Sequence, residues 1–176
     1  MDGEETEFTT ELPGESTETA EPDFDHLWGI ITDGFIGAVG GLVGTGSLTV
    51  GLLIAASLGA FDINEFATLA ELTGLDALFA ANPPAVGYVL FLLTGMVMWP
   101  LLFASIGSYL PGDRYAIKGL PFGFVLWTGF APAFYVDYTG LTMALYLVLT
   151  LGAHFSYGFT LGAVFDYLGD RPETLV

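Results

Sequence analysis

His154 is the side chain in the apolar part of the chain whose type can do chemistry. It lies in the apolar stretch 140–168, 14 residues from each end, which corresponds to about 21 Å of helix on either side. An ionisable group at that depth in a membrane helix is a functional candidate by default. His154 is therefore a candidate ligand for haem, a metal or a quinone, or a partner of Thr150 or Tyr157 in a proton relay.

The residues around His154 favour a structural histidine over a cofactor site. A haem held within one chain ordinarily uses two facing histidines, and the other histidine here, His26, falls in the acidic N-terminal segment. No HxxH, HExxH or carboxylate pair accompanies His154. We expect a neutral imidazole bonded to a neighbouring hydroxyl or carbonyl, and we assign no cofactor or metal.

Catalytic motifs are missing from the sequence. It contains no cysteine, nucleophile elbow, phosphate loop, metal-ligand cluster or basic nucleic-acid-binding patch. We expect neither an enzyme nor a nucleic-acid partner.

The helices that position His154 are predicted by four long apolar windows of the sequence. The chain is 53% hydrophobic with a mean hydropathy of +0.64. Windows of about twenty nearly uncharged residues are typical of membrane-spanning helices. They fall at about 30–58, 84–110, 116–136 and 140–168. These windows predict an all-α, integral membrane four-helix bundle that crosses the lipid bilayer of the cell membrane several times.

The chain is strongly acidic. Residues 1–27 hold ten carboxylates and no Lys or Arg, which predicts a disordered tail before a transmembrane domain at 28–176. Residues 28–176 still carry ten acidic residues against three basic ones. Crowded carboxylates repel one another weakly at about 1 M salt, where the Debye length is about 3 Å. We therefore predict a haloarchaeal, halophilic protein.

The basic residues predict the orientation. Arg114, Lys118 and Arg171 fall in the connection between the second and third windows and after the fourth, whereas residues 59–83 and 137–140 contain no Lys or Arg. Lys and Arg in short loops mark the cytoplasmic side. Both termini are therefore expected in the cytoplasm.

The phrase YLPGDR at 109–114 returns as YLGDR at 167–171, which suggests an internal repeat. A shift of 58 positions also pairs Tyr88 with Tyr146 and Trp99 with Tyr157. Two helical hairpins duplicated in this way would be parallel. Independent use of Tyr at membrane interfaces and Gly-Asp in turns remains the alternative.

Residues 59–82 connect the first and second windows and are too polar to span a membrane. A possible capping box, Asp62 with Glu65, and a break at Gly74 predict an amphipathic interfacial helix within about 62–80. Its apolar stripe consists of Ile63, Phe66, Ala67, Ala70 and Leu72. The segment could instead act as a lid or dock a partner.

Small residues and one proline predict how the helices pack. Glycines at helical spacing let another helix approach closely, either within the chain or from another subunit. The candidates are Gly37, Gly40, Gly41 and Gly44 in the first window and Gly158 and Gly162 in the fourth. Pro100, deep in the second window, should kink its helix and free backbone carbonyls.

Three segments carry a resemblance. LTGMVMWPLLFASIGSYLPG, GFVLWTGFAPAFYVDYTGL and YGFTLGAVFDYLGDRPE resemble an uncharacterised family of small four-span membrane proteins from haloarchaea, over about residues 30–175. The resemblance implies a halophilic source. Because we associate the family with gene neighbourhoods of haem–copper terminal oxidases, it also implies an accessory respiratory subunit. It brings no catalytic residues.

Together these features predict a non-catalytic accessory subunit or assembly factor of a larger membrane complex, such as a respiratory oxidase. Its partners would be other membrane subunits or a second copy of itself. A small oligomeric channel or carrier and a haem- or quinone-binding protein using His154 are the alternatives.

Overall fold

The structure, a computed structural model, describes residues 24–169, and all regular elements in this part of the chain are helical. The predicted all-α class is therefore confirmed. Most of the predicted tail at 1–27 lies outside the described residues, although α1 already begins at Phe24. The elements are α1 (Phe24–Ser57), η1 (Ile63–Phe66), α2 (Ala67–Thr73), α3 (Pro83–Leu93), η2 (Thr94–Met98), α4 (Trp99–Ile106), η3 (Gly107–Tyr109), α5 (Tyr115–Ala133) and α6 (Gly140–Gly169).

Three of the helical segments are long and apolar enough to cross a membrane: Gly34–Ser57, Pro83–Tyr109 and Gly140–Gly169. These match the first, second and fourth predicted windows. The third, α5, has 19 residues and is not among them; it contains Lys118, Pro121 and Pro132, which lower its hydropathy. Membrane spanning by three helices is thus supported, while the fourth span stays a prediction.

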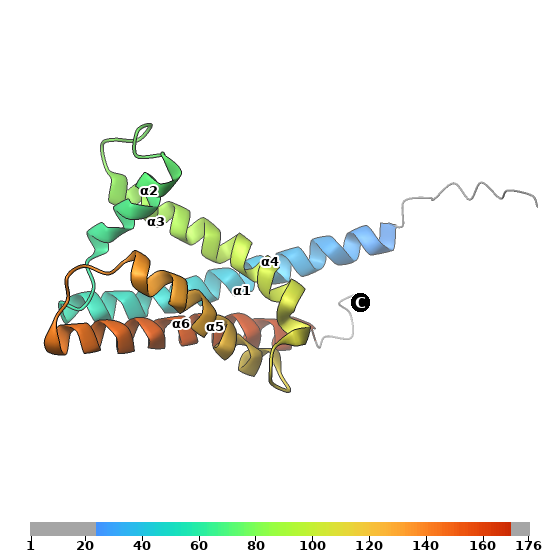
Figure 1. Cartoon of the computed structure of the whole chain (residues 1–176). Coiled ribbons are helices and arrows are strands. Elements are labelled where there is room, and N and C mark those ends of the chain that lie inside the picture. Colours follow the sequence, from blue (N-terminus) through green and yellow to red (C-terminus); the bar gives the residue numbers. More distant parts are fainter. Residues whose placement is uncertain (1–23, 170–176) are drawn as a thin grey trace, which may run out of the picture.

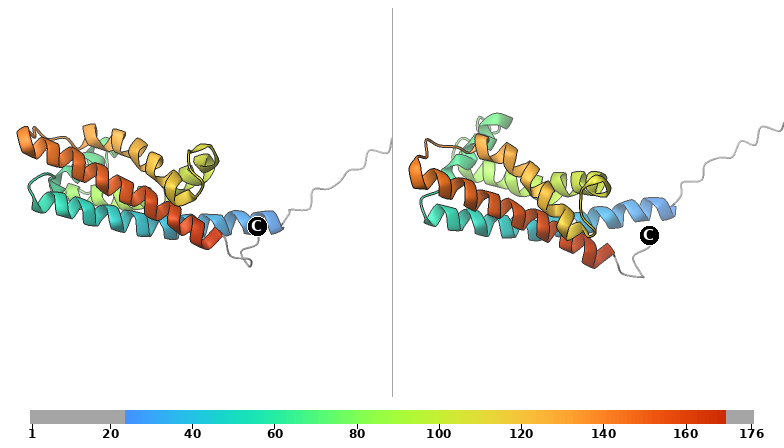
Figure 2. Two further views of the ribbon diagram at one scale, coloured as in Figure 1. Left: turned by 90° about the horizontal axis from the view of Figure 1, so that it is seen from below. Right: turned by 60° about the horizontal axis from the view of Figure 1, so that its bottom comes forward.

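The two longest helices, α1 and α6, run side by side, and α5 packs across α6 (Figures 1 and 2). The segment α3–η2–α4 instead packs on α1, mainly through η2. The connection α4–α5 lies at the same end as the start of α1 and the end of α6, whereas α2 lies at the opposite end (Figure 1). Both α5 and α3–η2–α4 therefore lean on the α1–α6 pair.

Glycines set the close contacts of α1 on two faces. Gly41 faces the second span, where an added Cβ would lie 2.6 Å from Pro100 Cγ, and Gly37 faces the same proline. Gly40 and Gly44 face α6, where an added Cβ on Gly44 would lie 2.9 Å from the Tyr157 ring. All four predicted glycines thus face other helices of this chain.

The contact between α5 and α6 is closer still. An added Cβ on Gly158 would collide with the carbonyl of Gly119, and one on Gly119 with the carbonyl of Gly158. Gly162 meets the backbone at Tyr115 in the same way, and Gly123 meets the carbonyl of His154. Small residues at spacing four permit this backbone approach. Sequence analysis named the glycines of α6 and overlooked those of α5.

Pro100 produces a π-helical turn in the second span. Proline has no N–H, so the carbonyls one turn before it lose a donor. The Trp99 N–H bonds the carbonyl of Thr94, five residues back, which gives the π-helix Thr94–Met98. The carbonyl of Gly95 accepts a hydrogen bond of 2.8 Å from the Tyr157 hydroxyl of α6. The carbonyl freed by the proline is thus satisfied from another helix.

The segment between α1 and α3 packs on the protein at one face. Phe66 and Ala70 are buried, and α2 packs against α3, whereas Ile63 and Leu72 are exposed. The two ends of the predicted stripe therefore do not pack on the protein, because the chain starts with a 3-10 turn and α2 ends at Gly74 in the left-handed conformation. The placement of this helix at a membrane interface stays a prediction. The interfacial helix is also shorter than predicted, since a turn-rich segment follows Gly74.

The predicted topology charges lie at the beginning of α5. Arg114 directly precedes α5, and Lys118 lies in its first turn with Nζ 5.0 Å from the centre of the Tyr115 ring. Arg171 lies outside the described residues. The start of α5 is capped by Asp166 of α6, whose carboxylate accepts from the N–H groups of Tyr115 (2.8 Å) and Ala116 (2.9 Å). The internal repeat stays a prediction.

Candidate functional site

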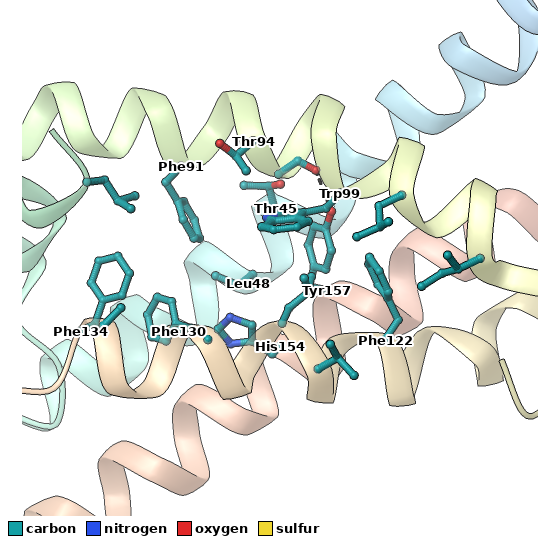
Figure 3. Close-up of a pocket in the computed structure, with 18 of the residues that line it drawn as sticks. Thr45, Leu48, Phe91, Thr94, Trp99, Phe122, Phe130, Phe134, His154 and Tyr157 are labelled. Atoms are coloured by element: carbon teal, nitrogen blue, oxygen red, sulfur yellow. Dashed lines mark hydrogen bonds between the residues drawn. The ribbon is translucent and has the colours of Figure 1, made fainter. Parts of the chain in front are cut away.

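A cavity of about 390 Å³ lies between the second span and α5, with α1 and α6 behind it (Figure 3). We call it the cleft. Its lining is apolar and aromatic, with Leu48, Phe91, Phe122 and Phe130 among its walls. No Asp, Glu, Lys or Arg is among the residues that line it. The cleft is therefore suited to an uncharged, apolar guest.

The cleft opens at the side of the helix set. Val125 of α5, which lines it, is 61% exposed, and Leu102 of α4 is also exposed. Gly129 lines the opening as well, and an added Cβ there would meet nothing within 4 Å. The cleft is therefore open at its side, between α5 and the second span.

His154 lines the cleft from the middle of α6 and is 3% exposed. Its Nδ1 lies 2.8 Å from the carbonyl oxygen of Thr150, one turn earlier. The imidazole also packs on Phe130 of α5, with ring centres 4.7 Å apart. The expected bond to a neighbouring carbonyl is present, and the ring is fixed between α6 and α5.

The two hydroxyls considered for a proton relay are used elsewhere. Thr150 Oγ1 donates to the carbonyl of Tyr146 (2.6 Å) and accepts from Trp127 Nε1 (3.0 Å). The Tyr157 hydroxyl donates to the carbonyl of Gly95. Neither hydroxyl bonds the imidazole of His154, so the described residues do not form the relay.

Thr45 of α1 also lines the cleft. It is 1% exposed, and its Oγ1 has no hydrogen-bond partner among the described residues. The hydroxyl lies against Gly95, where an added Cβ would come too close to it. A buried hydroxyl without a partner is costly, and this one is covered by the protein rather than open to the cleft.

Metal ligation within the chain has little support from this arrangement. No group of three His, Asp or Glu side chains comes together among residues 24–169. His26 belongs to the start of α1, whereas His154 lies near the middle of α6. A single imidazole nitrogen is the ligand that the cleft offers.

Sequence reasoning found His154 and missed the cleft around it. Pro100 was the available signal, because a disturbed helix opposite His154 changes the spacing between helices. Gly129 was a second one, since a glycine exposed on α5 leaves the opening unfilled. The aromatic wall of α5 could not be distinguished from ordinary packing in sequence.

The fold and the cleft define a helical membrane protein with a lateral apolar cavity and one buried histidine. The comparison with family models identifies its group. Residues 31–176 match a family of unknown function, DUF6789, and the chain belongs to this family. No curated protein and no solved structure matches the chain.

Proposed function

We propose that this protein is an integral membrane protein that binds an uncharged, membrane-soluble ligand in the cleft, with His154 as its polar anchor. The observation that carries the proposal is the apolar cavity of about 390 Å³ with a buried imidazole in its wall. Small-molecule sites commonly have volumes of about 300–1,000 Å³, apolar walls and few polar groups. The cleft meets each of these conditions.

The membrane setting of the proposal has four spans, both termini in the cytoplasm and a haloarchaeal origin. The positions of Arg114 and Lys118 at one end of the helix set support the orientation. The acidic composition supports the halophilic origin.

The proposal is tested by filling the opening. Gly129→Leu places a side chain at the mouth of the cleft, where an added Cβ meets no atom within 4 Å. Gly152→Leu is the matched control, because Gly152 is also exposed with nothing within 4 Å and does not line the cleft. Both proteins are purified in mild detergent, and bound small molecules are identified by native mass spectrometry and solvent extraction.

We expect wild type and Gly152→Leu to retain the same apolar molecule and Gly129→Leu to lose it. Unfolding temperatures measured for all three variants separate loss of ligand from loss of fold. Equal retention by all three variants, or no bound molecule in a wild type that also gains no stability from added apolar ligands, would contradict the proposal.

A second candidate function, an accessory subunit of a larger membrane complex, is favoured by the outer end of the molecule. Leu72 and Leu78 are each 74% exposed, and Phe79 beside them is exposed as well. These side chains lie in a segment without Lys or Arg, so attraction to anionic lipid is weak there. Co-purification of larger subunits that is lost on Leu72→Asp and Leu78→Asp together, while the fold is kept, would support this candidate.

The channel or carrier alternative gains nothing from the cleft. A path for ions requires polar groups along it, and the lining found here is apolar.

A further inference from the structure

We infer that the ligand of the cleft carries a hydroxyl group, and that this hydroxyl donates a hydrogen bond to Nε2 of His154. The inference rests on the proposed function and adds the chemistry of the ligand. It would hold for a quinol, which is the reduced form of a quinone, and for an isoprenoid alcohol. The experiments below distinguish these two sources.

The hydrogen bond at Nδ1 fixes the tautomer of His154. Nδ1 lies 2.8 Å from the backbone carbonyl of Thr150, and a carbonyl oxygen can only accept. Nδ1 therefore carries the proton. In a neutral imidazole the other nitrogen, Nε2, then has a free lone pair and acts as an acceptor.

The surroundings keep the imidazole neutral. No acidic side chain lines the cleft, so none faces the ring with a charge that would stabilise an imidazolium. The face toward α5 is covered by Phe130, and the neighbouring Tyr157 hydroxyl donates to the carbonyl of Gly95. A buried charge without a partner is far more costly than a neutral ring.

Nε2 lacks a partner within the protein. Among the described residues the imidazole forms its hydrogen bond through Nδ1, and no donor of the protein reaches Nε2. His154 lines the cleft, and Nε2 is not among the fully covered atoms that lack a partner, so a guest in the cleft can supply the missing donor. A hydroxyl is the donor that an uncharged lipid-soluble molecule most commonly carries.

Thr45 is a second polar residue of the cavity wall. Its Oγ1 has no partner among the described residues, but this atom is fully covered by protein, with Gly95 lying against it. The acceptor that the cleft offers to a guest is therefore Nε2 of His154.

The inference separates ligands that differ by a few atoms. A quinone carbonyl can only accept and would face the lone pair of Nε2, which is unfavourable. A quinol offers the donor, and its dimethyl ether has the same body without it. A ferric or ferrous haem would use the same lone pair for iron and would be recognised by its visible absorption.

The test compares binding of five probes to the purified protein in detergent without oxygen. The probes are decyl-hydroquinone, its dimethyl ether, decyl-benzoquinone, farnesol and farnesyl methyl ether. Binding is measured by the unfolding temperature and by tryptophan fluorescence, to which Trp99 in the cleft wall contributes. We expect at least one hydroxylated probe to bind about tenfold more tightly than its ether, which is typical for one buried hydrogen bond.

Variants assign this preference to His154. His154→Phe keeps an aromatic ring against Phe130 but removes the acceptor, so hydroxyl and ether probes should bind equally. Thr45→Val removes a hydroxyl that the protein covers, at nearly constant size, and should leave the preference unchanged. Gly152→Leu is the matched control and should behave as wild type.

Each outcome decides a separate point. Preference for the quinol over farnesol identifies a quinol site, and the reverse identifies a lipid alcohol. Equal binding of hydroxyl and ether probes by wild type would overturn the inference and leave the cleft proposal intact. Failure of all five probes to bind would contradict both the cleft proposal and the hydroxyl inference. A haem spectrum that disappears in His154→Phe would contradict the hydroxyl inference alone.

Discussion

The two sides of α5 differ in how they meet the rest of the protein. On the side toward α6, Gly119 and Gly123 bring the backbones into direct contact with Gly158 and the carbonyl of His154. On the side toward the second span, large side chains such as Phe122 face a cavity of about 390 Å³. The comparison shows that residue size sets the helix spacing, and that one tightly held side of α5 allows the other to stay open.

The far wall of the cleft is held in a different way. The second span reaches α1 through Gly41 and Pro100, and it reaches α6 through the bond between the Tyr157 hydroxyl and the carbonyl of Gly95. These contacts gather at the π-helix Thr94–Met98. One local irregularity therefore positions the wall, whereas α5 is positioned along much of its length.

The largest effect is expected from breaking the tight side. Gly158→Val places a branched side chain against the backbone of Gly119, where even a Cβ has no room. Overpacking typically costs about 1–3 kcal/mol, and a backbone collision should lie at or above the upper limit. We expect the unfolding free energy in detergent to fall by about 3 kcal/mol or more.

Gly152→Val is the control for Gly158→Val. It introduces the same side chain on the same helix at an exposed position with open space around it. It should cost nothing measurable, because valine has a slightly higher helix propensity than glycine, by a few tenths of a kcal/mol. Similar losses in both variants would show that the close α5–α6 contact is not what stabilises the pair.

The next effect concerns the wall of the cleft. Tyr157→Phe removes the donor to the carbonyl of Gly95 and leaves that carbonyl without its partner. Interhelical hydrogen bonds in membranes contribute about 0.6 kcal/mol on average and up to about 1.7 kcal/mol. We expect a loss near the upper value, measured as the unfolding free energy.

A double-mutant cycle with Pro100→Ala sharpens this prediction. Alanine restores an N–H at position 100, which supplies a donor to the carbonyls of the π-helical turn. The cost of Tyr157→Phe should therefore shrink in the Pro100→Ala background. An unchanged cost would mean that the hydroxyl of Tyr157 does not compensate for the proline.

A smaller effect is expected at the end of the α5–α6 contact. Asp166 accepts the N–H groups of Tyr115 and Ala116 and thereby caps α5 from another helix. Removing a cap typically costs about 1 kcal/mol. Asp166→Ala should lower the unfolding free energy by about that amount, and Asp166→Asn, which keeps one acceptor oxygen, should lower it less. Equal stability of Asp166→Ala and wild type would contradict the capping role.

Sequence patterns predicted what depends on single helices and missed what depends on pairs. The long apolar windows predicted four spans, and three of these are long and apolar enough in the structure to cross a membrane. The stripe of α2 was assigned a regular helical period, which the 3-10 turn at Ile63–Phe66 disrupts. Hydropathy carries no information about this change of period.

The candidate site also has one part that the sequence predicts and one part that it does not. The depth of His154 in its window made it a candidate, and its hydrogen bond to a carbonyl four residues earlier is local. The cleft is non-local, because it depends on the distance between α5 and the second span. The position of Nε2 at the cleft can be recognised only once the helices are in place.

The smallest effect is expected outside the spans, where Tyr138 joins α5 to α6. Burial raises the pKa of the Tyr138 hydroxyl above its usual value of 10; interaction with the Asp62 backbone lowers it in part, and the charges of Asp62 and Glu65 raise it again. A group whose pKa is raised in the folded state favours folding while it stays protonated. Stability should therefore be constant below about pH 9 and decline as the pH rises past 10. Tyr138→Phe should remove part of that decline in urea or thermal unfolding at high pH. If the stability of both proteins declines equally at high pH, other titrating groups cause the decline and Tyr138 does not contribute.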